Sequence, residues 1–189
     1  MTANREYEEL VQNVEAFRSE TEARRADAIQ CRRGCSECCR VELTVCRVEA
    51  DAIETYLRHH PVELEISADR CAFLRGDGAC AIYPARPLVC RTQGLPLSYP
   101  EAVIPPDAVL ARGQDREITW CPLNFRVNQP EAADVLDADR VNTILAVVNR
   151  RHSDGKTTPS NTRTALRSLA VTHQKDWSNA DEPSNPDAV

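Results

Sequence analysis

The sequence lacks long hydrophobic segments. It contains no run of about eighteen consecutive apolar residues, the length that a membrane-spanning helix needs. A signal peptide has a run of apolar residues after its charged start. The first residues here, MTANREYEELVQNVEAF, contain no such run. We therefore expect a soluble, cytoplasmic protein that does not engage a membrane.

The sequence also lacks an excess of positive charge. Lysine and arginine number 23 against 29 aspartate and glutamate residues, which gives a net charge of -6. Because affinity for nucleic acid rests mainly on cationic side chains that displace counterions, this balance argues against nucleic acid as a partner. There is neither a phosphate-binding loop nor a dinucleotide fingerprint, and no local signature for cysteine catalysis surrounds His152 or His173. We identify no catalytic residue.

Cysteine, in contrast, is abundant. The chain has nine cysteines, and four of them lie in the stretch CRRGCSECCR at residues 31–40. An odd number of cysteines in a reducing compartment argues against a framework of disulfides. Thiolates bind soft or borderline metals, and a tetrahedral zinc site or a four-iron cluster takes about four of them. We therefore predict metal binding, with enough thiols for two sites and one left over.

The spacing within this stretch indicates how some thiols divide. Cys35 and Cys38 are separated by two residues, a spacing that presents both sulfur atoms to one metal. Cys38 and Cys39 are adjacent, and adjacent side chains diverge, so we expect them to serve different sites unless one of them is the spare thiol. The ligand sets of two sites would then interleave along the sequence.

Two further cysteines lie on a predicted hairpin. Gly76-Asp-Gly78 would form its tip, which brings Cys71 and Cys80 together across it. The alternative is that these two are structural cysteines, buried in an apolar loop with Phe73 and Tyr83.

Arginines are frequent beside the cysteines in the sequence. Four thiolates leave a formal charge of about -2 on one divalent metal or on an oxidised four-iron cluster, and nearby cations would stabilise either. The neighbouring arginines therefore support metal binding but do not distinguish zinc from an iron–sulfur cluster. We expect Arg86 and Arg91, which flank Pro87 and Cys90, to point inward and to help bind the cofactor.

The hydrophobic pattern predicts a mainly α-helical, single small domain of amphipathic helices around an irregular, cysteine-rich metal-binding centre, with at most short strands. Four segments are expected: an N-terminal helix over residues 1–30, the metal-binding core over 31–121, C-terminal helices over 122–175 and a disordered tail over 176–189. Within the core, Thr44 is a predicted N-cap of a helix that ends near His59.

The C-terminal helices are expected in two pieces. Apolar residues at helical spacing predict one over 131–151, with an interruption near Asp137. A shorter helix would follow Pro159, with Ser160 or Asn161 as its cap.

Together the motifs resemble the YkgJ-like cysteine-cluster family, described as a zinc- or iron-chelating domain. The resemblance covers about residues 31–121, and C-x-I-Y-x-x-R-P-x-x-C-R is its most specific part. It implies eight recurring metal-binding cysteines, which correspond here to Cys31, Cys35, Cys38, Cys39, Cys71, Cys80, Cys90 and Cys121. Cys46 lies outside that set, so we expect it to be the spare thiol.

The predicted function is that of a cytoplasmic metal-binding protein that coordinates zinc or an iron–sulfur cluster. Spacing does not separate the two, because both accept four thiolates. The alternative is an iron–sulfur enzyme in redox chemistry or protein modification. Cys31, Cys35 and Cys38 have the spacing of radical S-adenosylmethionine enzymes, although Glu37 replaces the usual aromatic residue and no alternating strands and helices follow. In a third hypothesis, metal only folds the module and the acidic helices bind a protein partner that the sequence does not identify.

Overall fold

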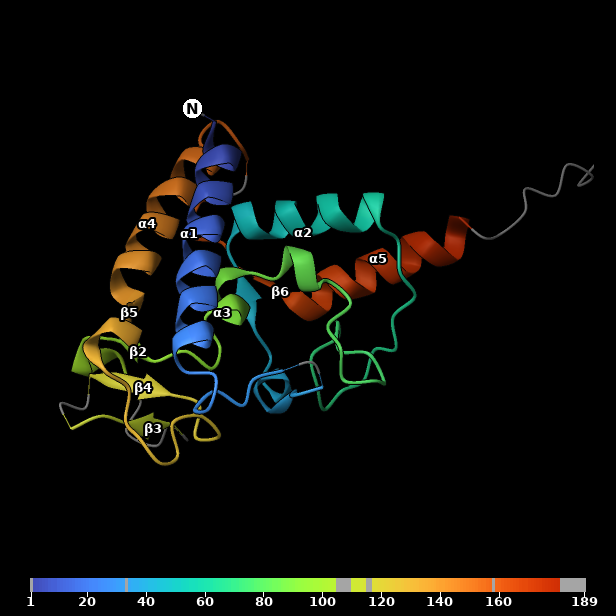
Figure 1. Cartoon of the computed structure of the whole chain (residues 1–189). Coiled ribbons are helices and arrows are strands. Elements are labelled where there is room, and N and C mark those ends of the chain that lie inside the picture. The colour runs from blue at the N-terminus through green and yellow to red at the C-terminus, as the bar shows by residue number, and fades with distance from the viewer. Residues whose placement is uncertain (1, 33, 105–109, 115–116, 158, 181–189) are drawn as a thin grey trace, which may run out of the picture. The chain divides into compact units, whose positions relative to one another are not determined.

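The structure, a computed structural model, describes residues 2–32, 34–104, 110–114, 117–157 and 159–180. These residues form five α-helices and several strands of two or three residues, so the expected mainly α-helical class is confirmed (Figure 1). The chain divides into two compact units, and the predicted single domain stays a prediction. The first unit comprises residues 1–35 and 87–160, and the second comprises residues 36–86 and 161–189.

The first unit is built on two packed helices, α1 (Ala3–Arg24) and α4 (Ala138–Ser153), with the short helix α3 (Leu88–Arg91) also against α1 (Figure 1). Apolar side chains at helical spacing are buried on both long helices, among them Tyr7, Leu10, Val14, Val141 and Val148. The first helix ends at Arg24 and not near residue 30, because the backbone leaves helical geometry at Arg25 and the Ala28 carbonyl accepts a hydrogen bond from the Phe125 amide.

A small sheet completes the first unit. Its strands lie in the order β3-β4-β2-β5, with bounds Ala111–Arg112, Ile118–Trp120, Leu97–Ser98 and Leu136–Asp137. The first three are antiparallel, and β5 runs parallel to β2. Because β5 takes Leu136 and Asp137 into the sheet, α4 begins only at Ala138, later than the predicted start at residue 131. Asp137 caps α4 by accepting a hydrogen bond from the Arg140 amide.

The second unit packs α2 (Arg47–His59) against α5 (Leu166–Ala180), beside an antiparallel pair of β1 (Thr44–Val45) and β6 (Thr164–Ala165). Its hydrophobic core comes from both helices, β1 and the segment after α2, and includes Val45, Ala50, Ile53, Leu57, Phe73, Ile82, Leu166, Leu169 and Ala170.

Because β1 pairs with β6, both helices of this unit begin later than the sequence predicted. Thr44 belongs to β1 and does not cap α2. Cys46 is the N-cap instead, and the Glu49 carboxylate accepts a hydrogen bond from its amide at 3.1 Å. The predicted end of this helix near His59 is confirmed. In the same way β6 takes Thr164 and Ala165, so α5 begins at Leu166 and not beside Ser160 or Asn161.

The last helix extends into the segment that was predicted to be disordered. We expected disorder over residues 176–189, whereas α5 continues to Ala180. Two residues before this segment, Gln174 accepts a hydrogen bond from the Leu64 amide at 2.9 Å, which holds this part of the helix. Residues 181–189 lie outside the described part of the chain.

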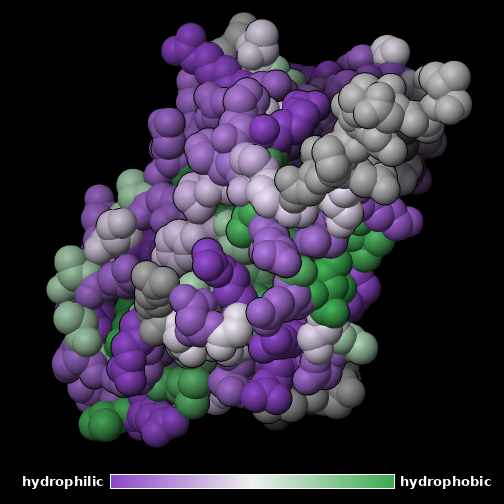
Figure 2. Space-filling view, turned by 90° about the vertical axis from the view of Figure 1, so that its right-hand side faces the viewer, coloured by the Kyte–Doolittle hydropathy of each residue, from purple (hydrophilic) through white to green (hydrophobic). Residues whose placement is uncertain are grey.

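The surface is largely polar on the face drawn in Figure 2. Hydrophilic residues cover most of that face, and hydrophobic residues form small, separate groups. Within the described residues, no helix has both the length and the apolar character that crossing a membrane requires.

Candidate metal centre

The eight predicted ligands are divided equally between the two units. Cys31, Cys35, Cys90 and Cys121 belong to the first unit, and Cys38, Cys39, Cys71 and Cys80 belong to the second. Cys46, the predicted spare thiol, is also in the second unit. Each unit therefore contains as many of these thiols as one tetrahedral metal site needs.

In the first unit, Asn124 connects the segments that carry three of these cysteines. Its side chain is 1% exposed, and its Nδ2 donates to Cys31 Sγ at 3.3 Å and to the Gly94 carbonyl at 2.7 Å. Its Oδ1 accepts from the Gln30 amide at 2.8 Å, and its own amide donates to the Cys121 carbonyl at 2.9 Å. Sequence reasoning missed Asn124, whose only local signal is its place three residues after Cys121.

Gly94 lets the segment after α3 approach Cys31 closely. Its φ is +91°, a conformation that favours glycine, and a Cβ atom there would overlap Cys31 Sγ. That atom would also lie 3.2 Å from Asn124 Nδ2. Because α3 carries Cys90 and ends three residues before Gly94, the segment containing Cys90 is held against the segment containing Cys31.

In the second unit, the predicted hairpin between Cys71 and Cys80 is confirmed. Leu74 and Cys80 form an antiparallel bridge, and the Ala81 amide donates to the Phe73 carbonyl at 2.8 Å. The Cys71 amide donates to the Cys39 carbonyl at 2.6 Å, which attaches the hairpin to the 3-10 helix Glu37–Arg40. The cysteines of that short helix therefore lie beside the start of the hairpin.

The thiols of Cys71 and Cys80 lie in apolar surroundings. Burial raises the pKa of both, and the neighbouring Cys38 thiolate raises both further. The positive charges of Arg167 and Arg86 act in the opposite direction, on the pKa of Cys71 and of Cys80 respectively. A metal that binds these sulfur atoms would therefore have to displace protons, which makes its affinity dependent on pH.

Cys46 differs from the other cysteines in its surroundings. It is 5% exposed, and burial together with the nearby Glu49 carboxylate raises its pKa to about 12. Its backbone caps α2, with Glu49 as the reciprocal partner. The prediction that Cys46 is the spare thiol stays a prediction.

Both arginines predicted to point inward are buried, with exposed fractions of 9% for Arg86 and 7% for Arg91. In the first unit, Arg91 Nη1 donates to Glu15 Oε1 of α1 at 2.8 Å. In the second unit, the Arg86 guanidinium lies over the ring of Tyr83, 3.7 Å from its centroid. The predicted role of both arginines in binding a cofactor stays a prediction.

The described residues contain no group of three or more His, Cys, Asp or Glu side chains arranged to hold a metal ion. The backbone thus brings the cysteine segments together, while the sulfur atoms do not form a coordination sphere. The donor chemistry fits a thiophilic metal, because the side chains that these segments carry are thiols. The N–H of Asn124 directed at Cys31 Sγ fits as well, since such bonds orient sulfur ligands.

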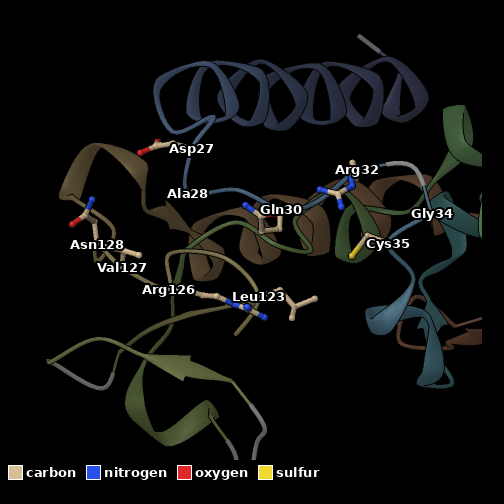
Figure 3. A pocket seen from close by; sticks show the side chains of 10 residues that line it. All are labelled: Asp27, Ala28, Gln30, Arg32, Gly34, Cys35, Leu123, Arg126, Val127 and Asn128. Carbon is tan, nitrogen blue, oxygen red and sulfur yellow. The ribbon is translucent and has the colours of Figure 1, made fainter.

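A pocket of about 860 Å³ lies in the first unit, beside the loop that follows α1 (Figure 3). Cys35 and Arg32 line it from that loop, and Leu123 and Arg126 line it from the segment after Cys121. A thiol and two guanidinium groups therefore border the same pocket.

Comparison with known protein families gives one match. The family model described as "CxxCxxCC: Putative zinc- or iron-chelating domain" matches residues 30–122. The cysteine-rich region of the chain is thus similar to this family. The matched region contains all nine cysteines and confirms the resemblance to the YkgJ-like cysteine-cluster family. No curated protein and no solved structure matches the chain.

Proposed function

We propose that this protein is a cytoplasmic metal-binding protein that holds zinc or an iron–sulfur cluster through its clustered cysteines. The observation that carries the proposal is that hydrogen bonds in each unit bring together segments bearing the cysteines of the chelating motif. The match of residues 30–122 to the zinc- or iron-chelating family supports metal chelation in the same region. A reducing compartment would keep these thiols available to the metal.

The bound metal would supply folding free energy to segments that have little regular structure. In the second unit, the hairpin that begins at Cys71 and the 3-10 helix that contains Cys38 are both short. In the first unit, the loop around Asn124 has no regular secondary structure. Metal binding energy at such structural sites appears directly as stability, because the unfolded chain has no preformed site. Removing the metal should therefore lower the melting temperature.

The test is the metal content of the full chain purified without oxygen. Zinc and iron are measured per chain by mass spectrometry, and the visible spectrum of the same sample reports iron–sulfur absorption. We expect one or both metals in stoichiometric amounts, and a lower melting temperature after treatment with a chelator. A chain that carries neither metal, and gains none when zinc or iron with sulfide is supplied under reducing conditions, would overturn the proposal.

The pocket beside Cys35 favours a second function, that of an iron–sulfur enzyme in redox chemistry or protein modification. Arg32 and Arg126 would attract an anionic substrate there, close to a cysteine of the chelating motif. A catalytic site of this kind keeps one coordination position open, whereas a structural site is closed by four sulfur ligands. X-ray absorption spectroscopy of the metal-loaded protein counts these ligands. Four sulfur atoms around every metal would favour the structural function, and an oxygen or nitrogen neighbour would favour the enzyme.

The structure argues against one form of that enzyme. Radical S-adenosylmethionine enzymes resemble parallel barrels of alternating strands and helices. The described strands here have two or three residues and pair mainly antiparallel. The spacing of Cys31, Cys35 and Cys38 therefore lacks the structural context that this enzyme class requires.

A further inference from the structure

We propose that the pocket beside the loop after α1 binds a small organic molecule with two anionic groups, which Arg32 and Arg126 hold (Figure 3). The inference builds on the second of the functions proposed above, because it names the chemical class of molecule that this pocket would take. Binding of such a molecule does not itself require a metal at the cysteines. This claim and the claim of metal binding can therefore fail separately.

The two guanidinium groups that border the pocket have no carboxylate partner within the described part of the chain. Arg32 and Arg126 are both exposed, and neither forms an ion pair with Asp27, the acidic residue of the same lining. Elsewhere in this unit, by contrast, Arg91 Nη1 lies 2.8 Å from Glu15 Oε1. An anionic ligand would supply the partner that the two pocket arginines lack.

The two guanidinium groups lie on separate segments of the chain that hydrogen bonds join. The Phe125 amide donates to the Ala28 carbonyl at 2.9 Å, and the Gln30 amide donates to Asn124 Oδ1 at 2.8 Å. Each bond lies within two residues of an arginine that lines the pocket. The walls are therefore in place before a ligand arrives, which reduces the entropy that binding costs.

Phe125 has a backbone conformation that a residue with a side chain rarely adopts, with φ of +52°. Its side chain is buried and lies edge-on to the Trp120 ring, with the ring centroids 6.5 Å apart. The next three residues, Arg126, Val127 and Asn128, line the pocket. Backbone strain of this kind persists where the surrounding packing imposes it, and it is common at binding sites. The buried ring thus anchors the turn that presents Arg126 at the pocket.

The charges along the pocket define the class of ligand. Across Figure 3, Arg126 lies between Asp27 and Arg32. Guanidinium groups bind carboxylates and phosphates through paired N–H donors, so a ligand with one such group at each arginine satisfies both. A third anionic group directed towards Asp27 would be repelled. The volume of about 860 Å³ is enough for a small organic molecule.

The test measures binding of defined anions to the full chain under reducing conditions, by isothermal titration calorimetry. Glutarate carries two carboxylates, phosphoglycolate carries a phosphate and a carboxylate, and pentanoate is the matched monoanion of glutarate. We expect at least one dianion to bind about tenfold or more tightly than pentanoate, because it engages a second guanidinium. The tighter of the two dianions shows whether the second group of the ligand is a carboxylate or a phosphate.

Substitutions show whether binding occurs in the pocket. Arg32→Met and Arg126→Met each remove one charged donor and should weaken binding of the tighter dianion by about tenfold or more. Arg126→Lys keeps the charge but loses the forked donors, so its affinity should fall between those of Arg126→Met and the unsubstituted protein.

Arg150→Met is the matched control, because it removes the same charge from the same unit and should leave the affinity unchanged. Arg150 is exposed near the end of α4, next to Arg151, whose Nη1 lies 2.9 Å from Glu6 Oε1 in the first turns of α1. The pocket lies beside the loop that follows the opposite end of α1.

Two results would overturn the inference. One is that neither dianion binds more tightly than pentanoate. The other is that Arg150→Met weakens binding as much as the two pocket variants, since the effect would then come from overall charge. Circular dichroism and gel filtration show whether each variant folds.

Metal content, measured on the same samples, separates this inference from the proposed function. A metal-loaded chain that binds no dianion would contradict the inference alone. A chain that binds a dianion but takes up neither zinc nor iron would contradict metal binding alone.

Discussion

Replacing Gly94 with alanine tests the packing around Cys31 directly. The backbone at Gly94 has φ of +91°, and a methyl group there would overlap Cys31 Sγ and approach Asn124 Nδ2 to 3.2 Å. Asn124 cannot easily retreat, because its side chain is 1% exposed and holds three segments by hydrogen bonds. We expect Gly94→Ala to destabilise the protein and to displace the Cys31 thiol.

The magnitude has two parts. An alanine in the left-handed region costs about 1–2 kcal/mol relative to its preferred geometry. Forcing an additional methyl group into a well-packed position costs about 1–3 kcal/mol. The expected loss in the free energy of unfolding is therefore about 2–5 kcal/mol.

Gly34 supplies a matched control. It has the same φ of +91°, but a Cβ atom there would meet nothing within 4 Å. Gly34→Ala should therefore cost only the conformational part, about 1–2 kcal/mol. Urea unfolding of both variants, followed by circular dichroism, gives the difference, which isolates the contact with Cys31 and Asn124.

Equal destabilisation by the two substitutions would refute this reasoning, because it would mean that the space beside Gly94 adapts without cost. Metal content provides an independent readout. If Cys31 is a ligand as proposed, Gly94→Ala should bind less metal than Gly34→Ala. Equal metal content would show that the position of the Cys31 thiol does not depend on close packing.

Three further substitutions test other parts of the structure. Arg91→Met removes the partner of Glu15 in a partly buried ion pair, and should lower the free energy of unfolding in urea by about 1–3 kcal/mol. Cys46 has a pKa raised from 9.0 to about 12, so its folded form keeps a proton that the unfolded chain loses, and stability should fall as pH rises from about 9 towards 12. Cys46→Ala should reduce that slope by up to about 1.4 kcal/mol per pH unit, measured by urea unfolding between pH 8 and pH 10.5. Arg167→Met removes hydrogen bonds to the Ser67 and Arg70 carbonyls just before Cys71, and should lower stability by about 1–3 kcal/mol and speed metal release to a chelator.

Each of these has a control. Arg5→Met breaks an exposed ion pair with Glu9 and should cost less than about 1 kcal/mol, so an equal effect of Arg91→Met would contradict the importance of burial. An unchanged pH slope in Cys46→Ala would show that this thiol ionises normally. Arg163→Met removes bonds to Thr44, away from the hairpin, and faster metal release there than in Arg167→Met would contradict the role of Arg167.

The sequence by itself predicted three of the helices, the hairpin and the resemblance of the cysteine-rich region to a chelating family. Apolar residues at helical spacing predicted α1, α2 and α4, because burial of one helix face needs that period. The hairpin at Cys71 was predictable as well, since Gly76-Asp-Gly78 is a local turn signal. The type and spacing of the cysteines indicated thiolate chelation, which the matching family model supports.

The tertiary structure alone decided where the elements begin and which cysteine segments meet. Thr44 pairs with Ala165, and Leu136 joins the strand at Leu97, so residues with helix-capping or helical patterns became strands. Asn124 joins the segments of Cys31 and Cys121 through one buried amide. These contacts connect residues far apart in the chain, and no local pattern encodes them, because a backbone hydrogen bond takes its partner from whatever segment the packed core brings within reach.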